Sequence, residues 1–368
     1  PAFPITPSTE IPQFVSTFIS NGEIDTEFIP VESEHSAMSA AIGAEAAGCR
    51  TLTATSSCGM ALMWEELYVA ASNRLPLALA LVNRALSGPI NINCDHSDSM
   101  GARDTGWIQI YAENNQEVYD NFVQAYRIAE HKDVRLPIMV CQDGFITSHA
   151  VENIELIETD QVKKFVGEYE PEQYLLNPKM PMAMGPYATS PFYMETKMAQ
   201  NEAMKNAKKV ILDVADEFAR MTGRQYGFFE EYRLEDADYA IVMIGSAAGT
   251  TKDAIDELRN QGKKVGLLKL RVFRPFPGDE IAKALSHTKA VAILDRSEGF
   301  RAGGGPLSAE IKEHFYDAGL TTKAVSYIYG LGGRDYTVDE AKQVYAELED
   351  MIENGTKLPQ YRYIGLRK

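Results

Sequence analysis

Short apolar runs alternate with longer segments of helical periodicity over the first 150 residues. An apolar residue at every third or fourth position predicts a helix, and a brief continuous apolar run predicts a buried strand. The expected strands are 28–31, 51–54, 76–82 and 137–142, and the expected helices are 34–48, 58–73 and 117–131. Strands of this kind between helices are typical of a parallel sheet that helices cover on both faces. The predicted fold class is therefore α/β.

The alternation breaks between residues 151 and 237. Residues 169–191 are rich in Pro, Met and Tyr and have no clear period, which indicates a long wrapping loop. A long helix is expected next, at 195–222. Its inward-facing side chains are expected to include Met198, Met204, Val210, Val214 and Phe218, with the methionines serving as ordinary core residues.

A second α/β unit follows this irregular middle region. Its expected strands are 239–244, 265–270, 290–294 and 324–327, and its expected helices are 250–261, 278–286 and 307–317. The chain therefore divides into three parts: a first domain at 1–150, a linker with a long helix at 151–235, and a second domain at 236–368.

Composition and charge narrow the functional class. The formal net charge of −16 argues against nucleic-acid binding, which needs a positive surface, and against docking on anionic membranes. The four cysteines form no C-x-x-C pair, which argues against a zinc ribbon or a ferredoxin-type cluster. Neither a signal peptide nor an apolar span of about 18 residues is visible in the sequence. We expect a soluble, cytoplasmic chain with no nucleic-acid or membrane partner.

Two acidic residues, Glu32 and Glu34, follow the apolar run 28–31, where a strand should end and a helix begin. Ligands of open α/β sheets bind outside the carboxyl ends of the strands. The helix that follows is dominated by Ala and Gly, and such small residues let a cofactor or another backbone approach closely. One of these carboxylates is thus a candidate for a buried, hydrogen-bonding acid. Alternatively, both only complement the positive end of the helix dipole.

A stiff loop near the amino terminus holds Thr6 between Pro4 and Pro7. Such a loop could orient the Thr6 hydroxyl toward a carboxylate or a carbonyl group. In the alternative interpretation the loop is a rigid cap, with Ser8 or Thr9 starting a helix that carries Phe14 and Phe18.

Arg84 follows the apolar strand 76–82 and precedes a polar loop. An arginine at the carboxyl end of a strand is well placed to bind a substrate carboxylate through two parallel hydrogen bonds. Asp95, His96 and Asp98 in the same loop could be read as metal ligands. We do not favour a metal site, because an irregular loop gives these three residues no helical register.

Glycine-rich motifs give little support for nucleotide binding. The strand-to-helix turns contain no G-x-G-x-x-G, and the chain has no G-x-x-x-x-G-K-[ST] phosphate loop. Gly303–Gly305 could hold an anion through backbone N–H groups, although a tight turn is the simpler interpretation. Gly330, Gly332 and Gly333 are expected to form a turn that closes the second domain.

Five motifs occur in order along the chain. They are Phe3-Pro4-Ile5-Thr6-Pro7, Val31-Glu32-Ser33-Glu34-His35-Ser36-Ala37, Thr53-Ala54-Thr55-Ser56-Ser57, Asn83-Arg84-Ala85 and Arg103-Asp104-Thr105-Gly106-Trp107. In this order they resemble the alpha subunit of the 2-oxoacid:ferredoxin oxidoreductases, most closely the pyruvate enzyme. The resemblance continues through Arg271–Pro277 to the Gly-Gly-Arg-Asp before Tyr336, and so covers nearly the whole chain.

The resemblance implies a thiamine-diphosphate enzyme whose pyrimidine-binding domain and transketolase C-terminal-like domain lie in this subunit. It implies that Glu34 hydrogen-bonds N1′ of the aminopyrimidine, and that Thr6 and Arg84 bind the carboxylate and carbonyl of a 2-oxoacid. It places Ser57 and Cys58 in the turn beside the cofactor ring. Two residues depart from the family pattern: Phe3 stands where Tyr is common, and Cys58 where Gln is common. The second departure changes the expected contacts of the cofactor.

The implied reaction is the reversible oxidative decarboxylation of pyruvate to acetyl-CoA and CO₂, with coenzyme A as co-substrate and ferredoxin as electron acceptor. Beta, gamma and delta-type subunits are the implied partners. In this family the beta subunit holds Mg²⁺ and shares the thiamine diphosphate, and partner subunits hold the [4Fe-4S] clusters, so no metal site is expected here. Two alternatives stay open: the same chemistry on 2-oxoisovalerate, 2-oxoglutarate or oxalate, and a scaffold subunit without catalytic residues.

Overall fold

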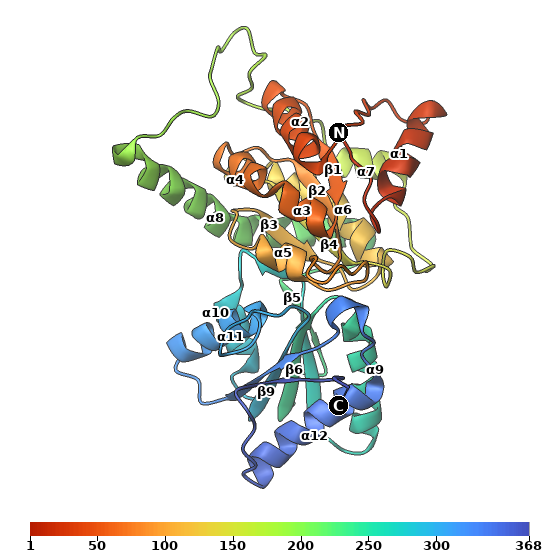
Figure 1. The fold of residues 1–368 in the computed structure, drawn as a ribbon, viewed down its shortest axis with the longest axis vertical. Coiled ribbons are helices and arrows are strands. Elements are labelled where there is room, and N and C mark those ends of the chain that lie inside the picture. The colour runs from red at the N-terminus through yellow and green to blue at the C-terminus, as the bar shows by residue number, and fades with distance from the viewer. Residues whose placement is uncertain (368) are drawn as a thin grey trace.

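The computed structural model describes residues 1–367 and contains two sheets. The sheets lie one after the other along the long axis of the molecule (Figure 1). The first sheet has the strand order β1-β2-β4-β3-β8. Its strands are β1 (Leu52–Thr55), β2 (Ala78–Asn83), β3 (Ile108–Tyr111), β4 (Ile138–Asp143) and β8 (Val272–Arg274). The first four strands are parallel, and β8 is antiparallel to β3. Strands β2 and β4 are buried at every position, which explains the continuous apolar runs 78–82 and 138–141; polar residues follow only at their carboxyl ends.

Helices cover both faces of the first sheet. One layer contains α2 (Glu34–Ala47), α3 (Ser57–Leu62) and α4 (Trp64–Ser72), and the other contains α6 (Asn115–Ala129), α7 (Thr159–Val166) and α8 (Ser190–Thr222). The helices α1 (Glu10–Ser20) and α5 (Ser97–Gly101) lie at the edges of this body (Figure 1). Each layer buries its own apolar cluster against the sheet, as an amphipathic helix requires.

The second sheet has the order β11-β10-β9-β6-β7-β5, and only β5 runs antiparallel to its neighbour. Its strands are β5 (Phe229–Tyr232), β6 (Tyr239–Ile244), β7 (Val265–Leu270), β9 (Ala290–Asp295), β10 (Lys323–Ile328) and β11 (Tyr361–Tyr363). The helices α9 (Ala247–Asn260) and α12 (Val338–Glu353) cover one face, and α10 (Gly278–Leu285) and α11 (Pro306–Asp317) cover the other (Figure 1). A short 3₁₀ turn, η1 (Leu331–Gly333), follows β10. The strand order reverses between β6 and β9, the switch point at which such sheets bind ligands.

The chain links the two sheets covalently at Arg271, between β7 of the second sheet and β8 of the first. Its carbonyl oxygen accepts from the backbone N–H of Tyr111 at 2.7 Å. The buried guanidinium donates to Asn121 at 2.8 Å and to the carbonyl of Gly227 at 3.1 Å. A single apolar cluster runs through residues of both sheets, so the two bodies share part of one core.

Three predicted features differ from the structure. Residues 28–31 are extended but form no sheet strand, because their one ladder contact is an isolated bridge between Ala2 and Pro30. The helix expected at 58–73 is two helices, since Met63 leaves helical geometry at φ −89° and ψ 15°. Met198 is 63% exposed, because the first turns of α8 extend beyond the sheet that the later turns cover (Figure 1).

The other predicted strands and helices are present, with small shifts at their ends. The elements that the sequence pattern missed are short or lie at sheet edges, apart from α12; they are α5, α7, α12, β3, β5, β8 and β11. The helix carrying Phe14 and Phe18 is present as α1, but the Thr9 side chain does not cap it. Within residues 1–367 no helix is long and apolar enough to cross a membrane.

Candidate functional site

Glu34 is the first residue of α2 and lies beside the carboxyl end of β1. Its side chain is only 7% exposed, yet it forms no hydrogen bond or ion pair with any of residues 1–367. It approaches Gly59 closely: a Cβ at Gly59 would lie 2.7 Å from Oε1 of Glu34 and 2.4 Å from Oγ1 of Thr55. Glycine at position 59 therefore makes room for the Glu34 carboxylate. Burying a carboxylate without a hydrogen-bond partner is costly, unless a ligand supplies that partner.

The turn before Gly59 holds Ser57 in an unusual conformation. Its φ of +48° is left-handed, a region that non-glycine residues seldom adopt. Two hydrogen bonds fix it there, from its backbone N–H to Asp98 at 3.0 Å and from its hydroxyl to the carbonyl of Ala85 at 2.5 Å. Ser57 is fully buried, whereas the neighbouring Cys58 side chain is exposed. The turn thus presents the thiol and not the hydroxyl.

The Cys58 thiol lies 2.9 Å from the hydroxyl of Ser87. This hydrogen bond is the main reason that the pKa of Cys58 is lowered, and the positive charge of Arg84 contributes as well. The two segments that carry Cys58 and Arg84 therefore meet at one place, although 26 positions separate these residues in the sequence.

Arg84 and Thr6 also come together. The Arg84 guanidinium donates Nη1–H to the backbone carbonyl of Thr6 and Nε–H to that of Asn91, each at 2.9 Å. Its side chain is 8% exposed, and no carboxylate of residues 1–367 lies within ion-pair distance of it. Its Nη2 group and the exposed Thr6 hydroxyl have no hydrogen-bond partner within the same residues. A buried cation without a protein anion is suited to an anionic ligand.

Asp98 connects the segment that carries Ser57 with the segment that carries Arg84. Its fully buried carboxylate accepts from the backbone N–H groups of Ser57 and Arg84, each at 3.0 Å, and from the Asn83 amide at 2.8 Å. Burial raises the pKa of Asp98 to about 6, although these hydrogen bonds act in the opposite direction. The sequence offered Asp98 only as a possible metal ligand. In the structure it fixes the position of Ser57 relative to Arg84.

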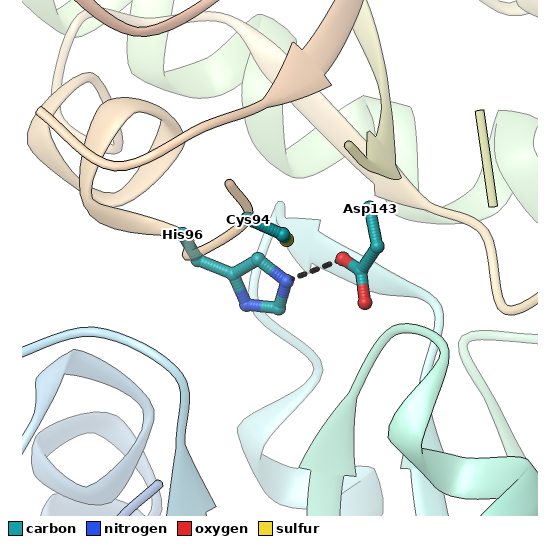
Figure 2. Close-up of side chains that lie close together, drawn as sticks. All are labelled: Cys94, His96 and Asp143. Carbon is teal, nitrogen blue, oxygen red and sulfur yellow. Dashed lines mark hydrogen bonds and ion pairs between the residues drawn. The ribbon is translucent and has the colours of Figure 1, made fainter. Parts of the chain in front are cut away.

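A second buried acid, Asp143, lies where the two sheets meet. It receives a hydrogen bond from His96 at 2.7 Å, and Figure 2 shows the two side chains beside Cys94. Ser246, just before α9, donates to it from its backbone N–H at 2.9 Å and from its hydroxyl at 2.5 Å, and Arg296 donates at 3.0 Å. Burial alone would raise the pKa of Asp143, but His96 and Arg296 hold it below its usual range.

Three groups of side chains in residues 1–367 have metal-like spacing, and none of them is the disfavoured Asp95–His96–Asp98 set. Cys94, His96 and Asp143 converge, but the Asp143 carboxylate is already occupied by the donors just described. A group formed by Glu113, Glu117 and Glu230 is already paired with two lysines, Lys252 and Lys269. The third group, His35 with Glu65 and Glu66, lies at the surface.

Family comparisons agree with this geometry. Residues 1–216 match the family described as pyruvate flavodoxin/ferredoxin oxidoreductase, thiamine diphosphate-binding. The chain belongs to this family. Residues 237–341 match the core domain II of pyruvate:ferredoxin oxidoreductase. The family membership predicted from the five sequence motifs is therefore confirmed, and with it the thiamine-diphosphate-binding class.

Several curated relatives align over the whole chain. The pyruvate synthase subunit PorA of Thermotoga maritima is 50% identical over 367 residues, which cover 100% of this chain and 93% of that protein. PorA of Methanocaldococcus jannaschii is 47% identical, with 100% and 92% covered. The ketoisovalerate oxidoreductase subunit VorA of Pyrococcus horikoshii is 44% identical, with 100% and 93% covered.

Solved structures support the fold. The 2-oxoglutarate:ferredoxin oxidoreductase of Magnetococcus marinus, with 2-oxoglutarate, coenzyme A and succinyl-CoA bound, matches with a TM-score of 0.70. The match has 20% identity and covers 94% of this chain and 61% of that one. A split-gene transketolase matches with a TM-score of 0.50 at 10% identity, covering 87% and 83%. At these identities the likeness concerns the fold alone, and it confirms the predicted α/β class.

Proposed function

We propose that this chain is a subunit of a thiamine-diphosphate-dependent pyruvate:ferredoxin oxidoreductase, and that it activates the cofactor and binds the 2-oxoacid. One observation carries the proposal: Glu34 and Arg84 are buried charges of opposite sign at the same polar edge of the first sheet, and neither forms an ion pair with any of residues 1–367. An empty scaffold would have no use for either charge, because each is costly to bury alone.

The residues around Glu34 fit the pyrimidine half of the cofactor. When bound, thiamine diphosphate would supply a ring carbon that, after losing its proton, is a nucleophile for the ketone of a 2-oxoacid, and a cationic ring that can delocalise the electron pair left when CO₂ departs. Glu34 would share a proton with N1′ of the aminopyrimidine, a role that needs a buried carboxyl group with a free oxygen. Cys58 would face the ring through its exposed side chain, and the buried Ser57 would set the shape of the turn.

Arg84 and Thr6 would bind the substrate. The free Nη2 of Arg84 can donate to a carboxylate, and the Thr6 hydroxyl, close to the same guanidinium, can donate to the carboxylate or the ketone oxygen. The backbone carbonyls of Thr6 and Asn91 already hold the guanidinium in place, so little conformational freedom is lost when substrate binds.

The remaining features of the assembly are part of the same proposal. Beta, gamma and delta-type subunits would supply Mg²⁺, the diphosphate site and the [4Fe-4S] clusters, with coenzyme A and ferredoxin as reactants. The division into 1–150, 151–235 and 236–368 would correspond to the pyrimidine-binding domain, the linker with its long helix, and the transketolase C-terminal-like domain. All four cysteines are free thiols, which is in keeping with a reducing, cytoplasmic compartment.

Glu34→Gln tests the catalytic role. In the complex reconstituted with its partner subunits, we expect turnover of pyruvate to fall about 10²-fold or more, the usual scale for an acid–base group. Glu45 on the same helix α2 is also buried but lies at the opposite end, so Glu45→Gln is the matched control and should leave turnover unchanged. Near-normal turnover in Glu34→Gln would favour the scaffold interpretation.

Substrate choice needs its own assay, because the named relatives act on two different 2-oxoacids, pyruvate and ketoisovalerate. We propose pyruvate, since the PorA relatives are 45–50% identical and the VorA relatives 44% identical. Acyl-CoA formation by the reconstituted complex should be compared for pyruvate, 2-oxoisovalerate, 2-oxoglutarate and oxalate. A higher kcat/KM for any acid other than pyruvate would overturn the assignment.

A further inference from the structure

The segment Asn91–Asn93 forms hydrogen bonds with the side chain of Arg84 and with the backbone next to it. The carbonyl of Asn91 accepts from Nε of the Arg84 guanidinium at 2.9 Å. The carbonyl of Asn93 accepts from the backbone N–H of Ala85, the residue after Arg84, at 3.0 Å. Any movement of this short segment would therefore change both the backbone and the side-chain position of Arg84.

The same segment also contacts the second domain. The Asn91 amide donates to the carbonyl of Gly332 at 3.1 Å, and the backbone N–H of Gly333 donates to the carbonyl of Cys94 at 2.6 Å. The packing leaves no space between the two parts: a Cβ on Gly333 would lie 2.3 Å from the Cβ of Asn93. Both glycines also have left-handed backbones, with φ of +61° and +79°.

We propose that the Gly332–Gly333 turn of the second domain positions Arg84 for the 2-oxoacid, acting through Asn91 and Asn93. This inference rests on the proposed role of Arg84 in substrate binding. The turn does not touch the substrate; it sets the place of the two carbonyl groups that orient the guanidinium. The second domain thereby influences how well the first domain binds its substrate, across a contact between residues about 240 positions apart.

Gly333→Ala in the reconstituted complex tests this coupling. The added methyl must push Asn93 away, so the guanidinium loses its alignment. We expect the KM for pyruvate to rise about tenfold, equivalent to about 1.4 kcal/mol, with kcat changed less than threefold and the apparent affinity for thiamine diphosphate unchanged. The matched control is Gly355→Ala, because Gly355 has a similar φ of +73° but no atom within 4 Å of the added methyl. It should leave all three parameters unchanged.

Asn91→Ala is the second variant, because it removes the amide that bonds Gly332 without adding volume. It should raise the KM for pyruvate in the same direction. Wild-type KM values in both variants, while Arg84→Lys raises KM, would overturn the positioning role and leave the proposed function standing. If Arg84→Lys itself leaves KM unchanged, the proposed function fails at Arg84. A fall in kcat without a change in KM in Gly333→Ala would also contradict the inference.

Discussion

The carboxyl edges of the two sheets have similar architecture, but they differ in whether their charged groups are paired within the chain. At the first edge, Glu34 and the Nη2 group of Arg84 have no protein partner within residues 1–367, and the Cys58 side chain is exposed. At the switch point of the second sheet, the polar groups of Ser246 and Arg296 already bind a carboxylate, that of Asp143. Asp143 belongs to the first sheet, at the end of β4.

This difference shows how one polypeptide can use the same ligand-binding edge in two ways. Backbone N–H groups and an arginine at the end of a parallel sheet attract an anion. In the second domain the chain supplies that anion itself, and the contact fastens the two domains together. In the first domain neither charge has a counter-charge among residues 1–367, and we assign the two to cofactor and substrate. A fold with two such edges therefore need not have two active sites.

The largest effect is expected from removing the carboxylate that Ser246 and Arg296 bind at the edge of the second sheet. Asp143→Ala removes the anion and leaves the buried guanidinium of Arg296 without its carboxylate partner, so we expect a loss of about 3–5 kcal/mol in the free energy of unfolding. Urea unfolding of the purified chain measures this loss. Asp133→Ala serves as the control, because Asp133 is an exposed partner of His131; its effect should be below about 0.5 kcal/mol. A loss under about 1 kcal/mol in Asp143→Ala would show that the carboxylate does not fasten the domains.

The pH dependence of that contribution has a definite sign. The pKa of Asp143 in the folded chain is lowered from the ordinary value of 3.8. Its stabilising effect should therefore be complete above about pH 4 and be lost only as the pH falls below that value. The part of the difference between wild-type and Asp143→Ala chains that is due to the carboxylate should therefore disappear only when urea unfolding is measured below about pH 4.

A smaller effect is expected at the far end of α2. Burial raises the pKa of Glu45 to about 7 from the ordinary value of 4.5, and this effect outweighs the opposing influence of the nearby Tyr169 and Thr51. The folded chain then binds more protons than the unfolded chain between these pH values, so stability falls as the pH rises from 4.5 to 7. Glu45→Gln should remove this slope and gain about 1–3 kcal/mol at pH 8.

Urea titrations at pH 5 and pH 8 on wild-type and Glu45→Gln chains measure the change in slope. If the two chains lose the same free energy between these pH values, Glu45 is ionised in the folded state. Turnover should be unaffected, which separates this buried carboxylate from Glu34 on the same helix.

Much of this fold follows from the sequence pattern. Long helices stand out by the regular spacing of their apolar residues, and buried strands such as β2 and β4 stand out by an apolar run of four or five residues. The strand β3 escaped notice because it has only four residues, one of them the buried Gln109. The break at Met63 was hidden because the apolar pattern continues through both helices.

The site was only partly predictable for a related reason. Glu34, Arg84 and Thr6 carry local signals, since each lies in a distinctive loop or directly after a strand. Asp98 and Asp143 act through partners distant in the sequence, up to 153 positions away for Asp143 and Arg296. Single-sequence patterns show spacing over a few turns, so a hydrogen-bond network between domains leaves no local trace.

The most direct test of the open first edge is the kinetics of Arg84→Lys in the reconstituted complex, with pyruvate and thiamine diphosphate varied separately. Lysine keeps the charge but loses the planar group that the carbonyls of Thr6 and Asn91 hold in place. We predict that the KM for pyruvate rises about tenfold or more while the apparent affinity for thiamine diphosphate stays constant. An unchanged dependence on pyruvate together with weaker cofactor binding would contradict the account, because it would assign the arginine to the cofactor.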